Sequence, residues 1–382
     1  MPLIEELKDV RATGAISPTA WQFGRFVCRH ADANDDGQLF LAAILASQAV
    51  EASHVCADIA HLHADLNGHY PRYDDSRIRA AFAADTRLPT AVLPAPDTWL
   101  AHLRNDPRCQ RVICTPATYA TAPKPLVIDE HGRVYLHRYF DFEIQLADVL
   151  RTMATTRPTI TVESTAATTA ALDTLFPSVD RPGWDVNWPK VAGFAALNRR
   201  LTVITGGPGT GKTTVVARLL ALVQQLYDKD LRISLAAPTG KAAARLAEAL
   251  EEQREELENA GIEAGAVDVK ASTIHRLLGY RPNSIHFRHN AANPIDADLV
   301  IIDEASMVPL PMMRRIVDAV PEGARLILLG DMYQLASVES GYVLGDLCNA
   351  AHPAVFSADF RSRFEAVTTG PKDVIPAATD EP

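Results

Sequence analysis

A glycine-rich segment between an apolar run and an apolar helix is the feature that most constrains this chain. It reads LTVITGGPGTGKTT, from Leu201 to Thr214. The β-branched run at its start favours a strand, and the apolar stretch Val215 to Val223 favours a helix. The spacing matches G-x-x-x-x-G-K-[ST], a loop that cradles phosphates at the start of a helix. The fixed positions are Gly206, Gly211, Lys212 and Thr213.

The chemistry of this loop explains its composition. Glycines let backbone N–H groups curve around phosphate oxygens, and the helix N-terminus adds partial positive charge. We expect Lys212 to reach the β- and γ-phosphates and the Thr213 hydroxyl to ligate Mg²⁺. A chance glycine turn is the alternative, which the order of strand, loop and helix disfavours. The predicted ATP·Mg²⁺ site contains Gly206, Gly207, Pro208, Gly209, Thr210, Gly211, Lys212, Thr213 and Thr214.

Composition narrows the class of protein. The chain has 382 residues, enough for two or three domains, and its 47% hydrophobic and 22% charged residues are ordinary for a globular protein. No apolar stretch is long enough to span a bilayer, and the N-terminus MPLIEELKDVRATG has no signal-peptide pattern. The net charge of −10 predicts that any nucleic acid binds in a local groove rather than through the overall field.

The cysteines indicate a reducing cytoplasm. They form no C-x-x-C pair and no even framework, so we expect mostly structural thiols. Cys109 and Cys114 are interpreted as buried small residues. The five cysteines are Cys28, Cys56, Cys109, Cys114 and Cys348.

A histidine-rich patch follows the first long helix. Zinc binding is one interpretation, but the spacing fits no standard structural site and only one cysteine takes part. Scattered core and surface histidines are the favoured interpretation. The patch contains His54, Cys56, His61, His63 and His69.

The N-terminal half is predicted to be mainly helical. Residues 4–66 have helical character, clearest from Leu39 to Val50, and Asp35-Asp36-Gly37 is expected to form a turn before that helix. Alternation from Pro125 to Phe142 predicts a β-hairpin. Further helices are expected at Ser76–Ala84, Thr98–Leu103, Asp141–Met153 and Ala170–Phe176, with a linker within Thr152–Thr169.

The second half alternates apolar strands and helices, which predicts a parallel α/β sheet of the P-loop class. The strand Leu231–Ala237 ends in PTGK, where parallel sheets place ligand contacts. These residues suit a phosphodiester, although a plain turn with a solvated lysine explains them equally well. In ASTIHRLLG, Thr273 and His275 are candidate DNA contacts, with a capped structural helix as the alternative. The DNA candidates are Pro238, Thr239, Gly240, Lys241, Thr273 and His275.

Two further apolar runs end in polar clusters. In DLVIIDEASM, the apolar run ends at Asp303 and Glu304. We expect Asp303 to hold the Mg²⁺ hydration shell and Glu304 to orient and deprotonate the attacking water. An edge-exposed acidic turn is the less favoured alternative. In RLILLGDMYQL, the apolar run is followed by a polar cluster that contains Asp331 and Gln334. We expect Gln334 to sense the γ-phosphate. The predicted catalytic residues are Lys212, Asp303, Glu304 and Gln334, with Thr213 and Asp303 as metal ligands.

Together these motifs resemble those of superfamily 1 helicases. Their residues are most similar to those of the RecD family, the alpha chains of exodeoxyribonuclease V. The resemblance implies a 5′-to-3′ DNA translocase that acts with RecB and RecC in double-strand break repair, with the N-terminal domain docking on RecC. It is carried by GGPGTGKTT (Gly206–Thr214), APTGKAAARL (Ala237–Leu246), STIHRLLG (Ser272–Gly279), DEASM (Asp303–Met307), LPMM (Leu310–Met313) and GDMYQLASVESGYVLGDLC (Gly330–Cys348).

The chain departs from the family pattern in three places. Pro189 stands where the family usually has a glutamine that reads adenine, and Met332 and Tyr333 replace a charged pair. After Cys348, the Pro- and Thr-rich tail is expected to be disordered, with no element to hold Arg361 or Arg363. A second RecA-like domain, which carries an arginine finger in the family, is not expected there, so the pattern is typical of a truncated reading frame.

The sequence therefore predicts four regions. They are a helical N-terminal domain (1–115), a hairpin, helix and linker (116–183), a RecA-like ATPase domain (184–350) and a tail (351–382). The predicted function is that of an ATP-dependent RecD-type helicase subunit, impaired by the absence of the second motor domain. The alternatives are a non-motor module that binds ATP and docks on RecC, and a P-loop ATPase unrelated to DNA. No nuclease cluster is apparent.

Overall fold

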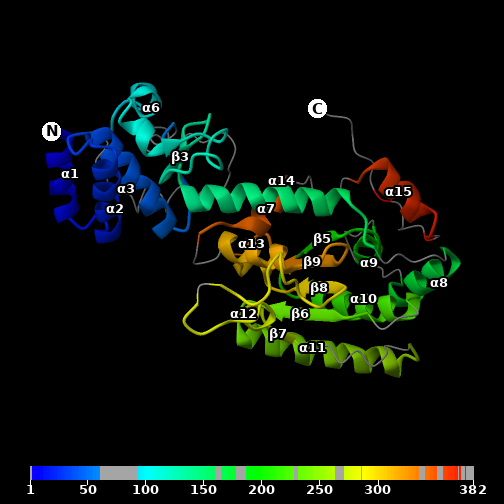
Figure 1. Cartoon of the computed structure of the whole chain (residues 1–382). Helices are drawn as coiled ribbons and strands as arrows, with labels where there is room; N and C mark the ends of the chain where they lie inside the picture. The colour runs from blue at the N-terminus through cyan, green and yellow to red at the C-terminus, as the bar shows by residue number, and fades with distance from the viewer. Residues whose placement is uncertain are drawn as a thin grey trace. The chain divides into compact units, whose positions relative to one another are not determined.

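The computed structural model describes two compact units (Figure 1). The first contains 1–145 with the short pieces 309–311 and 337–341; the second contains 146–308, 312–336 and 342–382. The described residues are 2–60, 93–159, 165–177, 186–227, 231–262, 271–284, 286–334, 340–350, 356–368, 370 and 375. His61, His63, His69 and the expected helix Ser76–Ala84 lie outside them.

Helices dominate the start of the first unit. Asp36 caps α3 by accepting hydrogen bonds from the N–H groups of Gln38 (3.1 Å) and Leu39 (3.0 Å), which explains why the predicted turn is followed by a helix. The prediction of a helix from Leu39 to Val50 is confirmed. These helices are α1 (Pro2–Ala12), α2 (Pro18–His30) and α3 (Gly37–Glu51).

The same unit holds a four-stranded sheet of order β1-β4-β3-β2. β3 and β4 form the predicted hairpin, and Gly132 (φ +80°) lies in its turn. The expectation of helical character over residues 4–66 is wrong at Cys56–Asp58, because this segment pairs with β4 as an edge strand. The strands are β1 (Cys56–Asp58), β2 (Ile113–Cys114), β3 (Leu126–Ile128) and β4 (Arg133–Leu136).

Between residues 93 and 159, the structure describes three further helical elements, the last of which continues into the second unit. The helix expected at Thr98–Leu103 is present within α6, and the one expected at Asp141–Met153 is present within the longer α7. The elements are α6 (Pro96–Asn105), the 3₁₀ turn η2 (Cys109–Arg111) and α7 (His137–Thr155).

The second unit is built on a five-stranded parallel sheet of order β5-β9-β8-β6-β7, which confirms the predicted α/β class. Its strands are β5 (Leu201–Thr205), β6 (Ile233–Ala237), β7 (Ala271–Thr273), β8 (Leu299–Ile302) and β9 (Arg325–Gly330). Its helical elements are α8 (Thr165–Leu175), α9 (Trp188–Asn198), α10 (Lys212–Leu226), α11 (Gly240–Asn259), α12 (Ile274–Leu277), η3 (Ala305–Met307), α13 (Leu310–Ala319), α14 (Val343–Ala350) and α15 (Ala358–Glu365).

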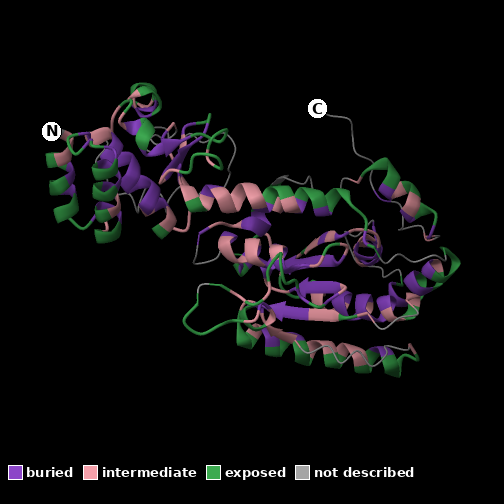
Figure 2. Ribbon diagram, in the orientation of Figure 1, coloured by how far each residue is buried: buried purple, intermediate pink, exposed green. Residues whose placement is uncertain are grey.

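Burial explains the near-continuous apolar strands. Every residue of β8 and β9 is buried, as expected for a sheet covered on both faces (Figure 2). Leu299 and Ile301 of β8 and Ile327 and Leu329 of β9 point into the core shared with the covering helices. Each such side chain contributes about 1.5–3 kcal/mol on burial.

The tail differs from the sequence expectation. Ser357 caps α15 by accepting a hydrogen bond from the N–H of Phe360 (3.3 Å). Phe360 and Phe364 are buried, with ring centroids each 5.3 Å from that of Phe194. The expectation of disorder is therefore wrong for Ala358–Glu365, because two phenylalanines four residues apart form one apolar helix face. Arg361 and Arg363 lie on this helix.

In the part of the chain that the structure describes, no helix is both long and apolar enough to cross a membrane.

Candidate functional site

The glycine-rich loop joins β5 to α10 in the predicted order. Gly209 (φ +73°) and Gly211 (φ +91°) adopt left-handed conformations that favour glycine. A Cβ at Gly206 would lie 2.7 Å from the Thr210 hydroxyl oxygen, so a side chain there would crowd the loop. Lys212 begins α10 and donates hydrogen bonds to the carbonyls of Gly206 and Gly207, the latter at 3.1 Å.

The other predicted catalytic groups follow strands of the same sheet. Asp303 and Glu304 follow β8, and Asp331 and Gln334 follow β9. Because all five strands are parallel, these residues and the loop after β5 lie at one edge of the sheet.

Backbone contacts join the loop to the end of β9. Thr205 is the register partner of Gly330, and the N–H of Gly206 donates to the carbonyl of Gly330 at 3.2 Å. The N–H of Met332 donates to the Thr205 hydroxyl at 3.1 Å. The glycine-rich loop and the segment that carries Gln334 are therefore fixed to one another.

The two carboxylates carry perturbed acidities. Burial raises the pKa of Asp303, and the nearby Lys212 ammonium and the Glu304 backbone N–H oppose this shift. Burial also raises the pKa of Glu304; Asp303 and Asp331 add to the increase, while Lys212 opposes it. Glu304 has a left-handed backbone conformation (φ +51°), which is unfavourable for a residue other than glycine. Such strained conformations are concentrated at functional sites. A carboxylate with a raised pKa suits a general base.

Ser306 is a site residue that the sequence reasoning missed. It is 1% exposed and its hydroxyl donates a 2.8 Å hydrogen bond to the Gln334 side-chain oxygen. The bond fixes the orientation of the amide and connects the segments after β8 and β9. A polar residue two positions after the Asp-Glu pair, in an otherwise apolar turn, is the only signal that the sequence offers for it.

The DNA candidates lie at the ends of β6 and β7, on the same edge of the sheet. Thr239 caps α11 by accepting from the N–H of Ala242 (3.2 Å), and Thr273 caps α12 by accepting from the N–H of Arg276 (3.2 Å). Both hydroxyls therefore have structural roles. Lys241 and His275 are exposed. Contact with DNA by these residues stays a prediction.

The residues present fit ATP with Mg²⁺. The loop provides the left-handed glycines and the helix N-terminus that a phosphate chain requires. The Thr213 hydroxyl and the Asp303 carboxylate are hard oxygen donors of the kind that Mg²⁺ prefers. Pro189 lies in the first turn of α9, where Asn187 caps the helix, and provides no side-chain amide for adenine.

Comparison with known proteins agrees with this arrangement. A model of the AAA domain matches residues 190–340, and a model of the N-terminal domain of RecBCD enzyme subunit RecD matches residues 12–135. The RecBCD enzyme subunit RecD of Mycobacterium tuberculosis is 40% identical over 82% of this chain. The chain is therefore similar to RecD subunits over most of its own length. The chain covers 47% of that relative, so it spans about half the length of the protein it matches.

Other RecD-type relatives match shorter parts. RecD of Haemophilus influenzae is 47% identical over 42% of this chain and 26% of its own length. The ATP-dependent RecD2 DNA helicase of Deinococcus radiodurans is 38% identical over 58% of this chain and 27% of its own length. Among solved structures, T4 UvsW covers 50% of this chain and 34% of its own at 14% identity, with a TM-score of 0.28 that is too low to bear on the fold.

Proposed function

We propose that this chain is a RecD-type ATPase that binds ATP with Mg²⁺, hydrolyses it and couples the reaction to single-stranded DNA. One observation carries the proposal: three segments far apart in the sequence bring the phosphate-binding loop, Asp303-Glu304 and Gln334 to one edge of a parallel sheet. The exposed Lys241 and His275 at neighbouring strand ends supply the proposed DNA contacts.

The residues have separate roles in this proposal. Lys212 neutralises charge on the β- and γ-phosphates, and Thr213 and Asp303 hold Mg²⁺, which supplies further positive charge at the phosphates when bound. Glu304 orients and deprotonates the attacking water. Gln334, oriented by Ser306, changes its hydrogen bonds when the terminal phosphate leaves and so couples hydrolysis to movement.

The proposed setting comes from the relatives. Their names place RecD in the RecBCD enzyme, so we propose that the N-terminal region docks on RecC and that the chain acts with RecB and RecC as a 5′-to-3′ translocase. Double-strand break repair and recombination in the cytoplasm is the proposed role.

ATP hydrolysis by the purified chain, with and without single-stranded DNA, tests the proposal. We expect DNA-stimulated hydrolysis that Lys212→Ala abolishes, because the substitution removes the only side-chain cation of the loop. Lys8→Ala, which removes an exposed lysine from α1, is the matched control and should leave hydrolysis unchanged. Hydrolysis that persists in Lys212→Ala would show that the site is assigned wrongly.

One observation favours a second candidate. Residues 12–135 match the model of the N-terminal domain of RecBCD enzyme subunit RecD, and they hold no part of the proposed nucleotide site. In this second proposal, the chain is a non-motor module that binds nucleotide and docks on RecC. Nucleotide binding and co-purification with RecB and RecC, without DNA-stimulated hydrolysis, would identify this function.

A further inference from the structure

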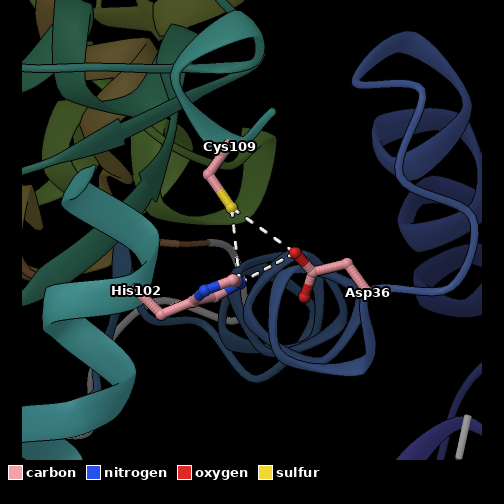
Figure 3. Close-up of side chains that lie close together, drawn as sticks. All are labelled: Asp36, His102 and Cys109. Carbon is pink, nitrogen blue, oxygen red and sulfur yellow. Dashed lines mark hydrogen bonds and ion pairs between the residues drawn. The ribbon is translucent and has the colours of Figure 1, made fainter. Parts of the chain in front are cut away.

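A second cluster of chemically reactive side chains lies in the first unit, apart from the nucleotide site. Asp36, His102 and Cys109 come from the start of α3, from α6 and from η2, and their side chains point toward one another (Figure 3). Asp36 Oδ2 lies 2.8 Å from His102 Nε2, and Cys109 Sγ lies 3.7 Å from each of these atoms.

The geometry excludes a nucleophilic triad. In a triad the histidine uses its two ring nitrogens separately, one toward the nucleophile and one toward the carboxylate. Here the Cys109 sulfur and the Asp36 carboxylate both lie on Nε2 of His102. Three potential ligand atoms therefore converge on one point.

The triangle matches the dimensions of a tetrahedral zinc site. With Zn–N and Zn–O near 2.1 Å and Zn–S near 2.3 Å, neighbouring ligand atoms lie about 3.4–3.6 Å apart. The observed edges are 2.8, 3.7 and 3.7 Å, so shifts below about 1 Å complete the geometry. Mixed nitrogen, oxygen and sulfur ligands suit Zn²⁺ better than Mg²⁺ or Ca²⁺, which prefer oxygen alone.

The surroundings hold each ligand in place. Asp36 uses its other oxygen, Oδ1, to cap α3, which leaves Oδ2 for the cluster. Nδ1 of His102 lies 3.9 Å from the Asp106 carboxylate, too far for a hydrogen bond but within ion-pair distance, so this carboxylate can support a metal-bound imidazole electrostatically. Cys109 is fully buried and the Asp36 side chain is 4% exposed, whereas that of His102 is 27% exposed and leaves a path for an ion.

The local charge favours a cation. Among the residues that the structure describes, the carboxylates of Asp35, Asp36 and Asp106 share one guanidinium, that of Arg108, whose Nη2 lies 3.8 Å from Asp36 Oδ2. Three negative groups against one positive group leave a surplus of negative charge, which attracts a divalent ion.

From this convergence of ligand atoms, we propose that Asp36, His102 and Cys109 bind Zn²⁺ in the N-terminal unit, with water as the fourth ligand. The sequence did not reveal the site, because its ligands are 66 and 73 residues apart along the chain and follow no zinc-finger spacing.

Cobalt substitution tests the proposal with a spectroscopic signature. The full chain, purified without a polyhistidine tag and stripped with a chelator, is titrated with Co²⁺. We expect a thiolate-to-Co²⁺ charge-transfer band with the strong visible bands of tetrahedral Co²⁺, both removed by one equivalent of Zn²⁺. Ions held by the oxygen ligands of the nucleotide site produce no thiolate band, so the two sites are distinguished. Absence of the band in the wild-type chain would overturn the proposal.

Variants assign the ligands. Cys109→Ser should lose the charge-transfer band, whereas the control Cys114→Ser, a buried thiol on β2, should keep it. His102→Gln, at a partly exposed position that tolerates change, should weaken Zn²⁺ binding at least about tenfold. Asp106→Asn, which changes a group beside the metal-bound histidine, should weaken Zn²⁺ binding about tenfold. A band that survives in Cys109→Ser, or Zn²⁺ affinity unchanged in His102→Gln, would contradict the assignment. Circular dichroism of each variant confirms that it is folded.

Discussion

Single residues at the sheet edge combine a structural constraint with a chemical property. Glu304 follows directly after a buried strand, adopts a left-handed backbone and has a raised pKa. Lys212, at the end of the glycine-rich loop, opposes that increase. The proposed general base and the proposed phosphate ligand are therefore electrostatically coupled, and a change at one alters the other.

Glu304→Gln tests the proposed base. The substitution keeps the shape and removes the proton acceptor, so we expect ATP affinity to stay within about threefold while turnover falls by about 10²–10⁴. A base acts when deprotonated, so the raised pKa predicts that wild-type turnover falls with decreasing pH before the ordinary glutamate value of 4.5 is reached. Fluorescent-nucleotide binding and steady-state hydrolysis across pH measure the two effects. Wild-type turnover that stays flat down to that value would contradict the assignment.

Residue positions were predictable where a motif fixes them. Lys212 lies at the start of α10, and Asp303 and Gln334 follow β8 and β9, as loop composition and strand ends indicate; their roles stay predictions. Ser306 was missed because its role depends on a contact 28 residues away in the sequence. Thr273 was expected as either a cap or a DNA contact, and the structure shows the cap. Contacts between distant segments are thus what the sequence leaves out.

At the scale of elements, long apolar runs were predictable and short segments were not. β8 and β9 are buried along their whole length, so their sequences are apolar throughout. β7 and β1 have three residues each, too few for a pattern, and their strand character comes from pairing with β6 and β4. α15 was hidden by the Pro- and Thr-rich composition around it.

Phe364→Ala tests whether α15 contributes to the core of the second unit. Phe364 is fully buried, so we expect a loss of about 3–5 kcal/mol in the free energy of unfolding. Glu365→Ala, an exposed neighbour on the same helix, should change it by less than about 0.5 kcal/mol. Urea unfolding measures both, and amide hydrogen exchange should show protection of α15 in the wild type. Equal stability of the two variants would mean that the helix does not pack as described.

Asp298→Asn tests the junction where β6 and β8 begin. Asp298 accepts hydrogen bonds from the Arg232 side chain at 2.8 and 3.0 Å, and this interaction lowers its pKa. A lowered folded-state pKa adds stability above the ordinary value of 3.8, and that stability is lost as the pH falls through the folded-state value. Because Arg232 is exposed, we expect the variant to lose less than about 1 kcal/mol at neutral pH. Urea unfolding should show this difference shrinking below pH 3.8, and a constant difference would argue against the ion pair.

For the whole molecule, the charge balance limits how DNA can bind. A net charge of −10 opposes a polyanion, so the proposed DNA contact would depend on a few cations at the sheet edge. The affinity for DNA should therefore fall only slowly as the salt concentration rises, because few phosphates are neutralised.

Lys241→Ala tests this limit directly. Lys241 is exposed at the start of α11, next to the end of β6, where a phosphate contact carries no base information. We expect affinity to fall by a similar factor for unrelated single strands, and the slope of log affinity against log salt to decrease by about one. Lys241→Arg should keep the slope, and Lys8→Ala, which removes the same charge from α1, should also keep it. Fluorescence anisotropy with labelled oligonucleotides at several salt concentrations measures all three. If the slope of log affinity against log salt is unchanged in Lys241→Ala, the lysine does not contact DNA. The end of β6 would then be a plain strand–helix turn.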